Sequence, residues 1–163
     1  MTTLTSRQLI LAATLFSVVS SLGAWGFQAL GYEPCQLCYT QRYPHYAAVV
    51  IGALALATGW HRLAWAGALA ALATSAVGFY HSGVERKWWP GPASCSGGGD
   101  ISGLSPEDLL AQLTATDFVP CDEIPWRLSD AIPWQGLDIT MANLNAVGAL
   151  VAAFVWIAAA RRA

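Results

Sequence analysis

Four long stretches of the chain contain no charged side chain. They are 25, 19, 22 and 22 residues long and cover 8–32, 43–61, 63–84 and 139–160. A helix of about 20 apolar residues crosses the hydrocarbon core of a bilayer. Within lipid each backbone polar group must be paired inside its own segment, so spanning stretches of this kind are helical. The pattern predicts four membrane-spanning helices, near 9–30, 43–60, 63–81 and 140–160.

The predicted spans are rich in small residues, as in Gly52-Ala53-Leu54-Ala55 and Gly67-Ala68-Leu69-Ala70. Small side chains let the backbones of membrane helices approach closely. The connection between the second and third spans is a short one around Trp60-His61-Arg62, which requires an antiparallel hairpin. We therefore expect residues 1–163 to form one integral membrane domain, an all-α four-transmembrane-helix bundle.

The composition agrees with a membrane protein. Hydrophobic residues make up 55% of the 163 residues and charged residues only 11%, against about 25% charged in a typical soluble protein. Too little charge remains to solvate the outside of a soluble bundle, which is the alternative interpretation of these helices. The net charge of −2 argues against a nucleic-acid-binding protein, since such proteins carry a basic surface.

The loops of a four-span chain fall into two groups. Lys and Arg divide equally between the two sides, but all ten acidic residues lie in the segments 31–42 and 82–139. We predict that both termini are cytoplasmic and that these two segments are periplasmic loops. The alternative is a cleaved signal peptide within 7–24, although the apolar stretch continues past any cleavage site to Leu30.

All four cysteines lie in the two predicted periplasmic loops: Cys35, Cys38, Cys95 and Cys121. Disulfides persist outside the cytosol, so the location suits cysteine pairs. Four cysteines allow three pairings, among which the sequence alone does not choose. The spacing favours Cys35 with Cys38 and hence, by exclusion, Cys95 with Cys121.

The C-x-x-C motif from Cys35 to Cys38 lies at the start of the second span. Thiolates in such motifs are stabilised by helix N-terminal amides and nearby cations. Arg42 follows Cys38 by one helical turn and could share its face, either as a ligand contact or as an anchor at the membrane interface. Pro44 has no backbone N–H to bond the carbonyl of Thr40, so the helix is expected to start or kink there.

The sequence gives weaker support for a metal or haem site built from cysteine and histidine. A structural zinc site usually combines two close-spaced motifs, whereas Cys95 and Cys121 are separated by 25 residues, so no metal site is predicted. A c-type haem needs the motif C-x-x-C-H, and Tyr39 occupies the position of its histidine, so the motif is not one for c-type haem. A b-type haem between His45 and His81 stays open.

The long loop contains a helix start at Ser105-Pro106-Glu107-Asp108, with an N-cap serine, a proline at the first position and acids in the first turn. Leu109, Leu110 and Leu113 then form an apolar stripe. We expect a short amphipathic helix, which lies along the membrane surface or packs on the bundle.

The order of these motifs resembles the DsbB family, the bacterial inner-membrane disulfide bond formation proteins. The resemblance covers nearly the whole chain. It rests on Cys35-Gln-Leu-Cys38-Tyr-Thr-Gln-Arg42, His81-Ser-Gly-Val-Glu85, Cys95, and Val119-Pro-Cys121-Asp-Glu-Ile-Pro-Trp126. The chain departs from the usual pattern in the segment 129–136, which lengthens the link between Cys121 and the last span and bears on the choice of partner.

The resemblance implies a quinone-linked thiol oxidase with the four cysteines as its catalytic residues. A reduced periplasmic thioredoxin-fold protein of the DsbA type would attack the Cys95–Cys121 disulfide, with the mixed disulfide at Cys95. Exchange would pass the electrons to Cys35 and Cys38. Cys38 would react with a bound quinone, either ubiquinone or menaquinone, beside Arg42 and His81. Glu85 is expected to be structural.

Two other functions remain as alternatives. One is a non-catalytic four-span scaffold whose loops are held by structural disulfides. The other is a redox sensor or b-haem electron carrier. The C-x-x-C motif beside Arg42 at a membrane edge favours the enzyme.

Overall fold

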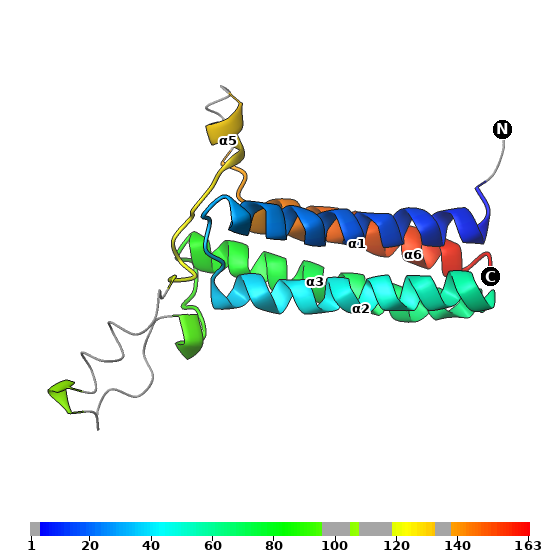
Figure 1. Ribbon diagram of the computed structural model, residues 1–163, viewed down its shortest axis with the longest axis horizontal. Coiled ribbons are helices and arrows are strands. Elements are labelled where there is room, and N and C mark those ends of the chain that lie inside the picture. The colour runs from blue at the N-terminus through cyan, green and yellow to red at the C-terminus, as the bar shows by residue number, and fades with distance from the viewer. Residues whose placement is uncertain (1–3, 96–104, 108–118, 133–137) are drawn as a thin grey trace.

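Four long helices run side by side along the length of the molecule (Figure 1). The computed structural model describes residues 4–95, 105–107, 119–132 and 138–163. Its long helices are α1 (Ser6–Ala29), α2 (Gln36–Thr58), α3 (Ala64–Glu85) and α6 (Met141–Ala160). The shorter elements are η1 (His61–Leu63), η2 (Ala93–Cys95) and α5 (Leu128–Ala131). The described residues contain no strand, only one isolated β-bridge, so the all-α prediction is confirmed.

The helices form a closed ring in which α1 packs on α2 and α6, and α3 packs on the same two helices. α2 ends at Gly59, whose φ of 73° caps the helix in the left-handed region that glycine adopts without strain. The η1 turn then leads directly into α3, giving the hairpin that the short connector predicts. The loops that carry the cysteines lie at one end of the bundle, whereas α1 begins and α6 ends at the other (Figure 1).

The interior of the bundle is built from small side chains and its outside from large apolar ones. On α6 the buried residues are almost all alanines, with Trp156 as the exception, while Val151 and Phe154 are exposed. Leu15 and Leu69 are exposed in the same way on α1 and α3. This arrangement suits a bundle in lipid, where small residues bring helices together and large apolar side chains face an apolar solvent.

Within the described residues, three segments are long and apolar enough to cross a membrane: Ser6–Ala29, His61–Glu85 and Met141–Ala160. α2 is as long as the others, with 23 residues, but is not among them. Its first half carries Gln41, Arg42 and His45, which lower its hydropathy. A fourth membrane span at α2 therefore stays a prediction. The polar side chains in the first half of α2 are costly in a membrane helix, so their presence calls for a structural or functional explanation.

Two helix boundaries differ from the expectation. α2 begins at Gln36, so a helix start at Pro44 is wrong, and the alternative of a kink there stays a prediction. The Cys35 sulfur caps the helix by accepting the backbone N–H of Cys38 at 3.3 Å, and the helix continues through Pro44 because one missing amide leaves only one carbonyl unpaired. α3 continues past residue 81 to Glu85.

Little of the predicted loop helix is described. Residues 106–107 are helical, in agreement with the start at Ser105-Pro106. The stripe of Leu109, Leu110 and Leu113 lies outside the described residues.

We expect Gly67→Ala to lower the free energy of unfolding by about 1–3 kcal/mol. A Cβ at Gly67 would lie 2.6 Å from the ring of Trp156, a side chain that is fully buried between the helices. Gly26→Ala is the matched control, since a Cβ there meets nothing within 4 Å, and alanine should stabilise α1 by about 0.5–1 kcal/mol. Equilibrium unfolding in detergent measures both, and equal effects of the two variants would contradict the packing.

Candidate active site

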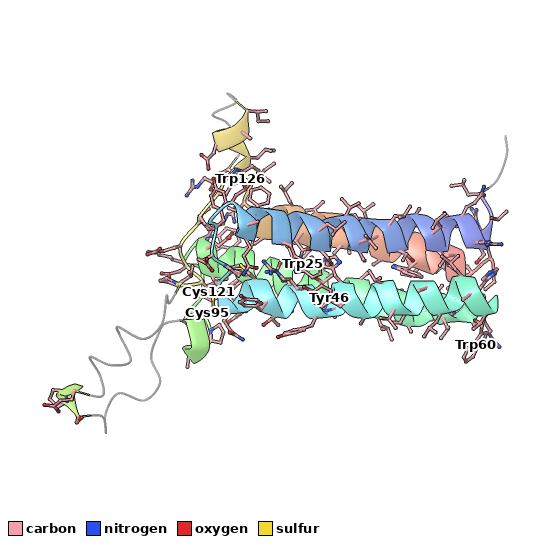
Figure 2. All side chains as sticks on the ribbon, in the orientation of Figure 1. Trp25, Tyr46, Trp60, Cys95, Cys121 and Trp126 are labelled. Atoms are coloured by element: carbon pink, nitrogen blue, oxygen red, sulfur yellow. A yellow bond between two sulfur atoms is a disulfide. The ribbon has the colours of Figure 1, made fainter. Side chains whose placement is uncertain are left out.

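The two cysteine pairs meet at one end of the bundle. Cys35 caps α2 and Cys38 lies in its first turn. A disulfide joins Cys95 to Cys121 (Figure 2), as the spacing predicts. Cys35, Cys95 and Cys121 belong to one buried apolar cluster, with Cys38 packed against it. The fold thus brings together two pairs that are 57 residues apart, counted from Cys38 to Cys95.

Cys35 and Cys38 are adjacent but not bonded. Their sulfurs lie 2.8 Å apart, and both cysteines are free thiols. Cys35 is buried, whereas Cys38 is partly exposed. The two cysteines are therefore neighbours, as the spacing predicts, but the structure shows them as a dithiol and not as a disulfide.

The two thiols differ in acidity. Both precede the predicted span 43–60. The hydrogen bond from Cys35 lowers the pKa of the Cys38 thiol below its ordinary value, and the charge of Arg42 acts in the same direction, against the effect of burial. The same hydrogen bond, together with burial, raises the pKa of Cys35. Cys38 is therefore the sulfur that carries negative charge first.

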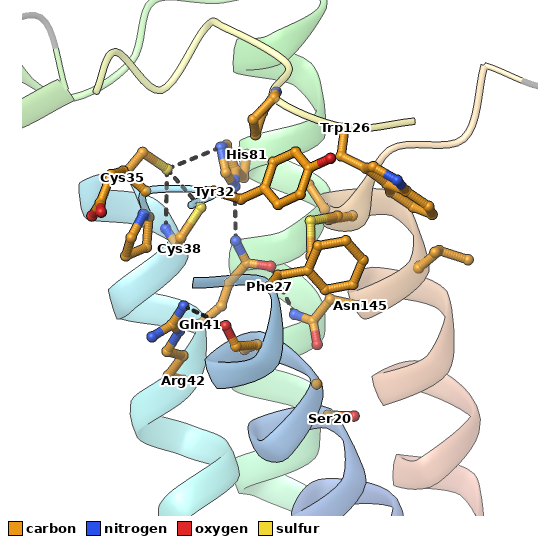
Figure 3. Close-up of a pocket in the computed structure, with 18 of the residues that line it drawn as sticks. Ser20, Phe27, Tyr32, Cys35, Cys38, Gln41, Arg42, His81, Trp126 and Asn145 are labelled. Carbon is orange, nitrogen blue, oxygen red and sulfur yellow. Dashed lines mark hydrogen bonds between the residues drawn. The ribbon is translucent and has the colours of Figure 1, made fainter. Parts of the chain in front are cut away.

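His81 lies directly beside the dithiol. Its Nε2 is 3.5 Å from the Cys35 sulfur, and its Nδ1 is 2.8 Å from Nε2 of Gln41 (Figure 3). The ring comes from α3, one turn before that helix ends, and is only 3% exposed. The structure therefore brings His81 to the cysteines.

The site also contains Asn145, a residue that the sequence analysis did not single out. Gln41 on α2 bonds both His81 and Asn145 of α6, and His45 bonds Asn145 in turn. The available signal was the amide of Asn145 within the predicted span 140–160, since polar residues in a span usually face the bundle interior. The apolar pattern does not tell which of these residues meet.

A cavity of about 360 Å³ opens beside Cys38 and is lined by residues of all four long helices. Its aromatic wall includes Phe27, which packs edge-on against Tyr32 at 5.5 Å and Trp126 at 5.3 Å. Its polar residues include Cys38, Arg42 and His81. An apolar chamber with a few convergent polar groups is typical of a small-molecule site.

Arg42 lies in the cavity wall and bonds two residues of α1. Its guanidinium donates to Oε1 of Gln28 at 2.9 Å and to the carbonyl of Ala24 at 3.3 Å, which ties α2 to α1. It also lies over the ring of Tyr39, 5.2 Å from the centroid. Arg42 is thus an anchor between helices and a charged group in the cavity wall.

Glu85 braces the same end of the bundle. It is 7% exposed and accepts a hydrogen bond of 2.6 Å from the hydroxyl of Thr140, which links the end of α3 to the start of α6. Nearby, Asp138 pairs with Arg127 at 2.8 Å. These contacts are consistent with the structural role expected of Glu85.

One alternative ligand fits the geometry in part. The sulfurs of Cys35 and Cys38 and a ring nitrogen of His81 lie within 4.8 Å of one another, a spacing that three ligands of a soft metal ion could adopt. The disulfide between Cys95 and Cys121 leaves no thiolate there to complete a four-cysteine zinc site.

Comparison with known proteins agrees with this geometry. No curated protein and no solved structure matches the chain. The family model described as disulfide bond formation protein DsbB matches residues 6–159, a range that contains all four cysteines and every residue of the cavity wall named above. The chain therefore belongs to the DsbB family of membrane disulfide bond formation proteins.

Proposed function

We propose that this protein is a membrane thiol oxidase that reoxidises a periplasmic dithiol protein of the DsbA type and passes the electrons to a quinone. The observation that carries the proposal is the arrangement of the cysteines. A disulfide and a dithiol share one buried cluster, and the dithiol borders a largely apolar cavity. Electrons that enter at the Cys95–Cys121 disulfide would therefore reach the cavity by thiol–disulfide exchange with the neighbouring Cys35–Cys38 pair.

Cys95 is the better entry point for the partner. It lines a second hollow of about 390 Å³, together with Trp88, Trp89 and Pro90. Both cysteines are buried, at 4% exposure for Cys95 and 0% for Cys121, but Cys121 does not border that hollow. A thiolate of the partner would attack the Cys95 sulfur and release Cys121 as a thiolate, and the partner's second thiol would then complete its own disulfide.

Exchange between the loops would regenerate the Cys95–Cys121 disulfide and leave Cys35 and Cys38 as thiols. That combination is the one in the structure, with a disulfide in the long loop and a dithiol at α2. The Cys35–Cys38 dithiol must then lose two electrons and two protons to become a disulfide again. The lowered pKa of Cys38 makes it the sulfur that starts this step.

The cavity residues fit a quinone. Phe27, Tyr32 and Trp126 offer aromatic surface for a flat ring, and Arg42 offers a fixed positive charge for a ring oxygen. When bound, a quinone supplies an acceptor for two electrons and two protons. The role of the chain is to hold Cys38 at the cavity and to keep Arg42 beside it through Gln28 and Ala24.

The same proposal places the protein in the bacterial inner membrane with four spans. α2 packs between α1 and α3 and matches their length, which supports it as the fourth span despite its polar first half. The cysteines lie at the end opposite to the start of α1 and the end of α6 (Figure 1). With the termini cytoplasmic, both cysteine pairs would face the periplasm.

The test is quinone reduction by the purified protein in detergent. The protein is mixed with a reduced DsbA-type partner and a soluble ubiquinone or menaquinone analogue, and the absorbance of the quinone is followed. We expect repeated turnover, with one partner disulfide formed for each quinone reduced. If neither quinone is reduced and the Cys95–Cys121 disulfide resists the partner, the disulfide is a structural one and the scaffold function stands.

A further inference from the structure

A line of hydrogen-bonded side chains runs from the dithiol into the bundle. It starts at Cys35 and draws on all four long helices. We call it the polar line, and its members are His81, Gln41, Asn145, His45 and Ser17. Figure 3 shows its first part, from Cys35 through His81 and Gln41 to Asn145.

The direction of the hydrogen bond at His81 follows from Gln41. The side-chain nitrogen of Gln41 donates to the carbonyl of Leu37 at 3.2 Å, and its side-chain oxygen accepts from Nδ2 of Asn145 at 2.7 Å. The group that faces Nδ1 of His81 at 2.8 Å is therefore the donating nitrogen. Nδ1 must accept, so the neutral imidazole carries its proton on Nε2, which faces the Cys35 sulfur.

The far half of the polar line has the same direction. Nδ2 of Asn145 donates to Gln41 and to the hydroxyl of Thr74, the latter at 3.1 Å. Its oxygen therefore faces Nε2 of His45, 2.8 Å away, and an amide oxygen can only accept. His45 is the donor, and its Nδ1 accepts from the hydroxyl of Ser17 at 3.3 Å.

The aligned bonds end at Cys38. The Cys35 sulfur faces Nε2–H of His81 at 3.5 Å, a ring that also interacts with the backbone of Cys121, and it accepts the backbone N–H of Cys38 at 3.3 Å. Its own proton is left to bond the Cys38 sulfur at 2.8 Å. Hydrogen bonds that point the same way polarise one another in a low-dielectric interior, so each donor in the line favours negative charge on Cys38.

Packing alone does not account for these residues. Ser17, Gln41, His45 and His81 are each 7% exposed or less, and burying polar groups in a membrane bundle is costly unless every one is paired. An apolar layer would avoid that cost. The end of the polar line at the dithiol offers a reason for keeping it.

We propose that Gln41, Asn145 and His45 are positioning residues that hold His81 in the tautomer with its proton on Nε2. Through Cys35, this tautomer directs negative charge to Cys38, the more exposed of the two cysteines that line the cavity. The importance of the polar line for turnover rests on the proposed oxidase function. Its effect on the tautomer and on the reactivity of Cys38 does not.

The first measurement is the tautomer of His81. The full-length protein is labelled with ¹⁵N in its imidazole rings, with Cys35 and Cys38 reduced, and the signals of His81 are assigned by their loss in His81→Gln. We expect a protonated Nε2 and an unprotonated Nδ1, and a mixture of tautomers in Gln41→Met. A wild-type His81 with its proton on Nδ1 would overturn the proposal.

The second measurement is the rate at which iodoacetamide alkylates Cys38 at neutral pH. Gln41→Met and Asn145→Leu keep side-chain volume but interrupt the polar line, and we expect a roughly tenfold slower reaction in each. Thr74→Val is the matched control. Thr74 is also buried and bonded to Asn145 and to the carbonyl of Gln41, but it lies beside the polar line, so the rate should stay within about twofold of the wild type.

The outcomes separate this inference from the oxidase function. Neither measurement uses a quinone or a partner protein. An equal loss of Cys38 reactivity in Thr74→Val and Gln41→Met would assign the effect to packing and overturn the positioning role, even with full quinone turnover in the wild type. Conversely, the predicted tautomer and rates would support the polar line even if the protein reduced no quinone.

Discussion

Cys38→Ser is expected to abolish repeated quinone reduction, lowering turnover by roughly a thousandfold or more. The reason is stoichiometric as well as electrostatic. The dithiol releases two electrons only by forming the Cys35–Cys38 disulfide, and a serine at position 38 leaves Cys35 without a second sulfur. The sulfur with the lowered pKa is removed at the same time. Quinone absorbance in detergent, with a reduced DsbA-type partner as electron donor, measures the loss.

The loop disulfide provides an internal control for that variant. Cys95 and Cys121 lie outside α2 and stay bonded to each other, so Cys38→Ser should still oxidise about one equivalent of partner before it stops. Thiol counting before and after mixing distinguishes this single turnover from misfolding. Wild-type turnover in Cys38→Ser would mean that electrons leave from the long loop, and the order of exchange proposed above would be wrong.

The second large effect is expected for Cys95→Ser, and it depends on the electron donor. With the protein partner as donor, turnover should fall by roughly a thousandfold or more, because Cys95 lines the outer hollow and offers the disulfide sulfur for attack. With a small dithiol such as dithiothreitol, much of the turnover should remain. A small donor can reach the partly exposed Cys38 without using the long loop.

The attacked sulfur can be identified directly. A partner that retains only its attacking cysteine should form a mixed disulfide with the wild type, and peptide mapping should place it at Cys95. A mixed disulfide at Cys121 would contradict the assignment, since Cys95 borders the outer hollow and Cys121 does not. A loss of turnover with both donors in Cys95→Ser would indicate that the long loop also supports the geometry of the dithiol.

The gross architecture followed from the length of the charge-free stretches. A span of lipid-crossing length must be helical because its backbone has no other partner, and the stub around Trp60-His61-Arg62 leaves no freedom in how α2 and α3 connect. The adjacency of Cys35 and Cys38 is equally local. A separation of three residues at a helix start brings two sulfurs together, and the disulfide of the remaining two cysteines follows by exclusion.

The local sequence pattern gave an incomplete prediction for α2, where two opposing effects act on the same segment. Of the two expectations for Pro44, a kink stays a prediction, whereas a helix start is wrong, since α2 begins at Gln36 with Cys35 as its cap. The polar first half of α2 likewise keeps it out of the set of helices that qualify as spans by composition, although it packs as one of the four. The cap at Cys35 is a local contact within the first turn of α2, whereas the place of α2 in the bundle rests on its contacts with α1 and α3.

The amino-acid sequence by itself determined that this protein is a helical membrane bundle with one close pair of cysteines at a helix start. Only the tertiary structure decided that Asn145 reaches Gln41, that Gln41 orients His81, and that His81 faces Cys35. The physical reason is that such meetings depend on the rotation and axial position of each helix relative to its neighbours. Those are set by the packing of many small side chains around the ring of helices, which no local pattern of polar and apolar residues records.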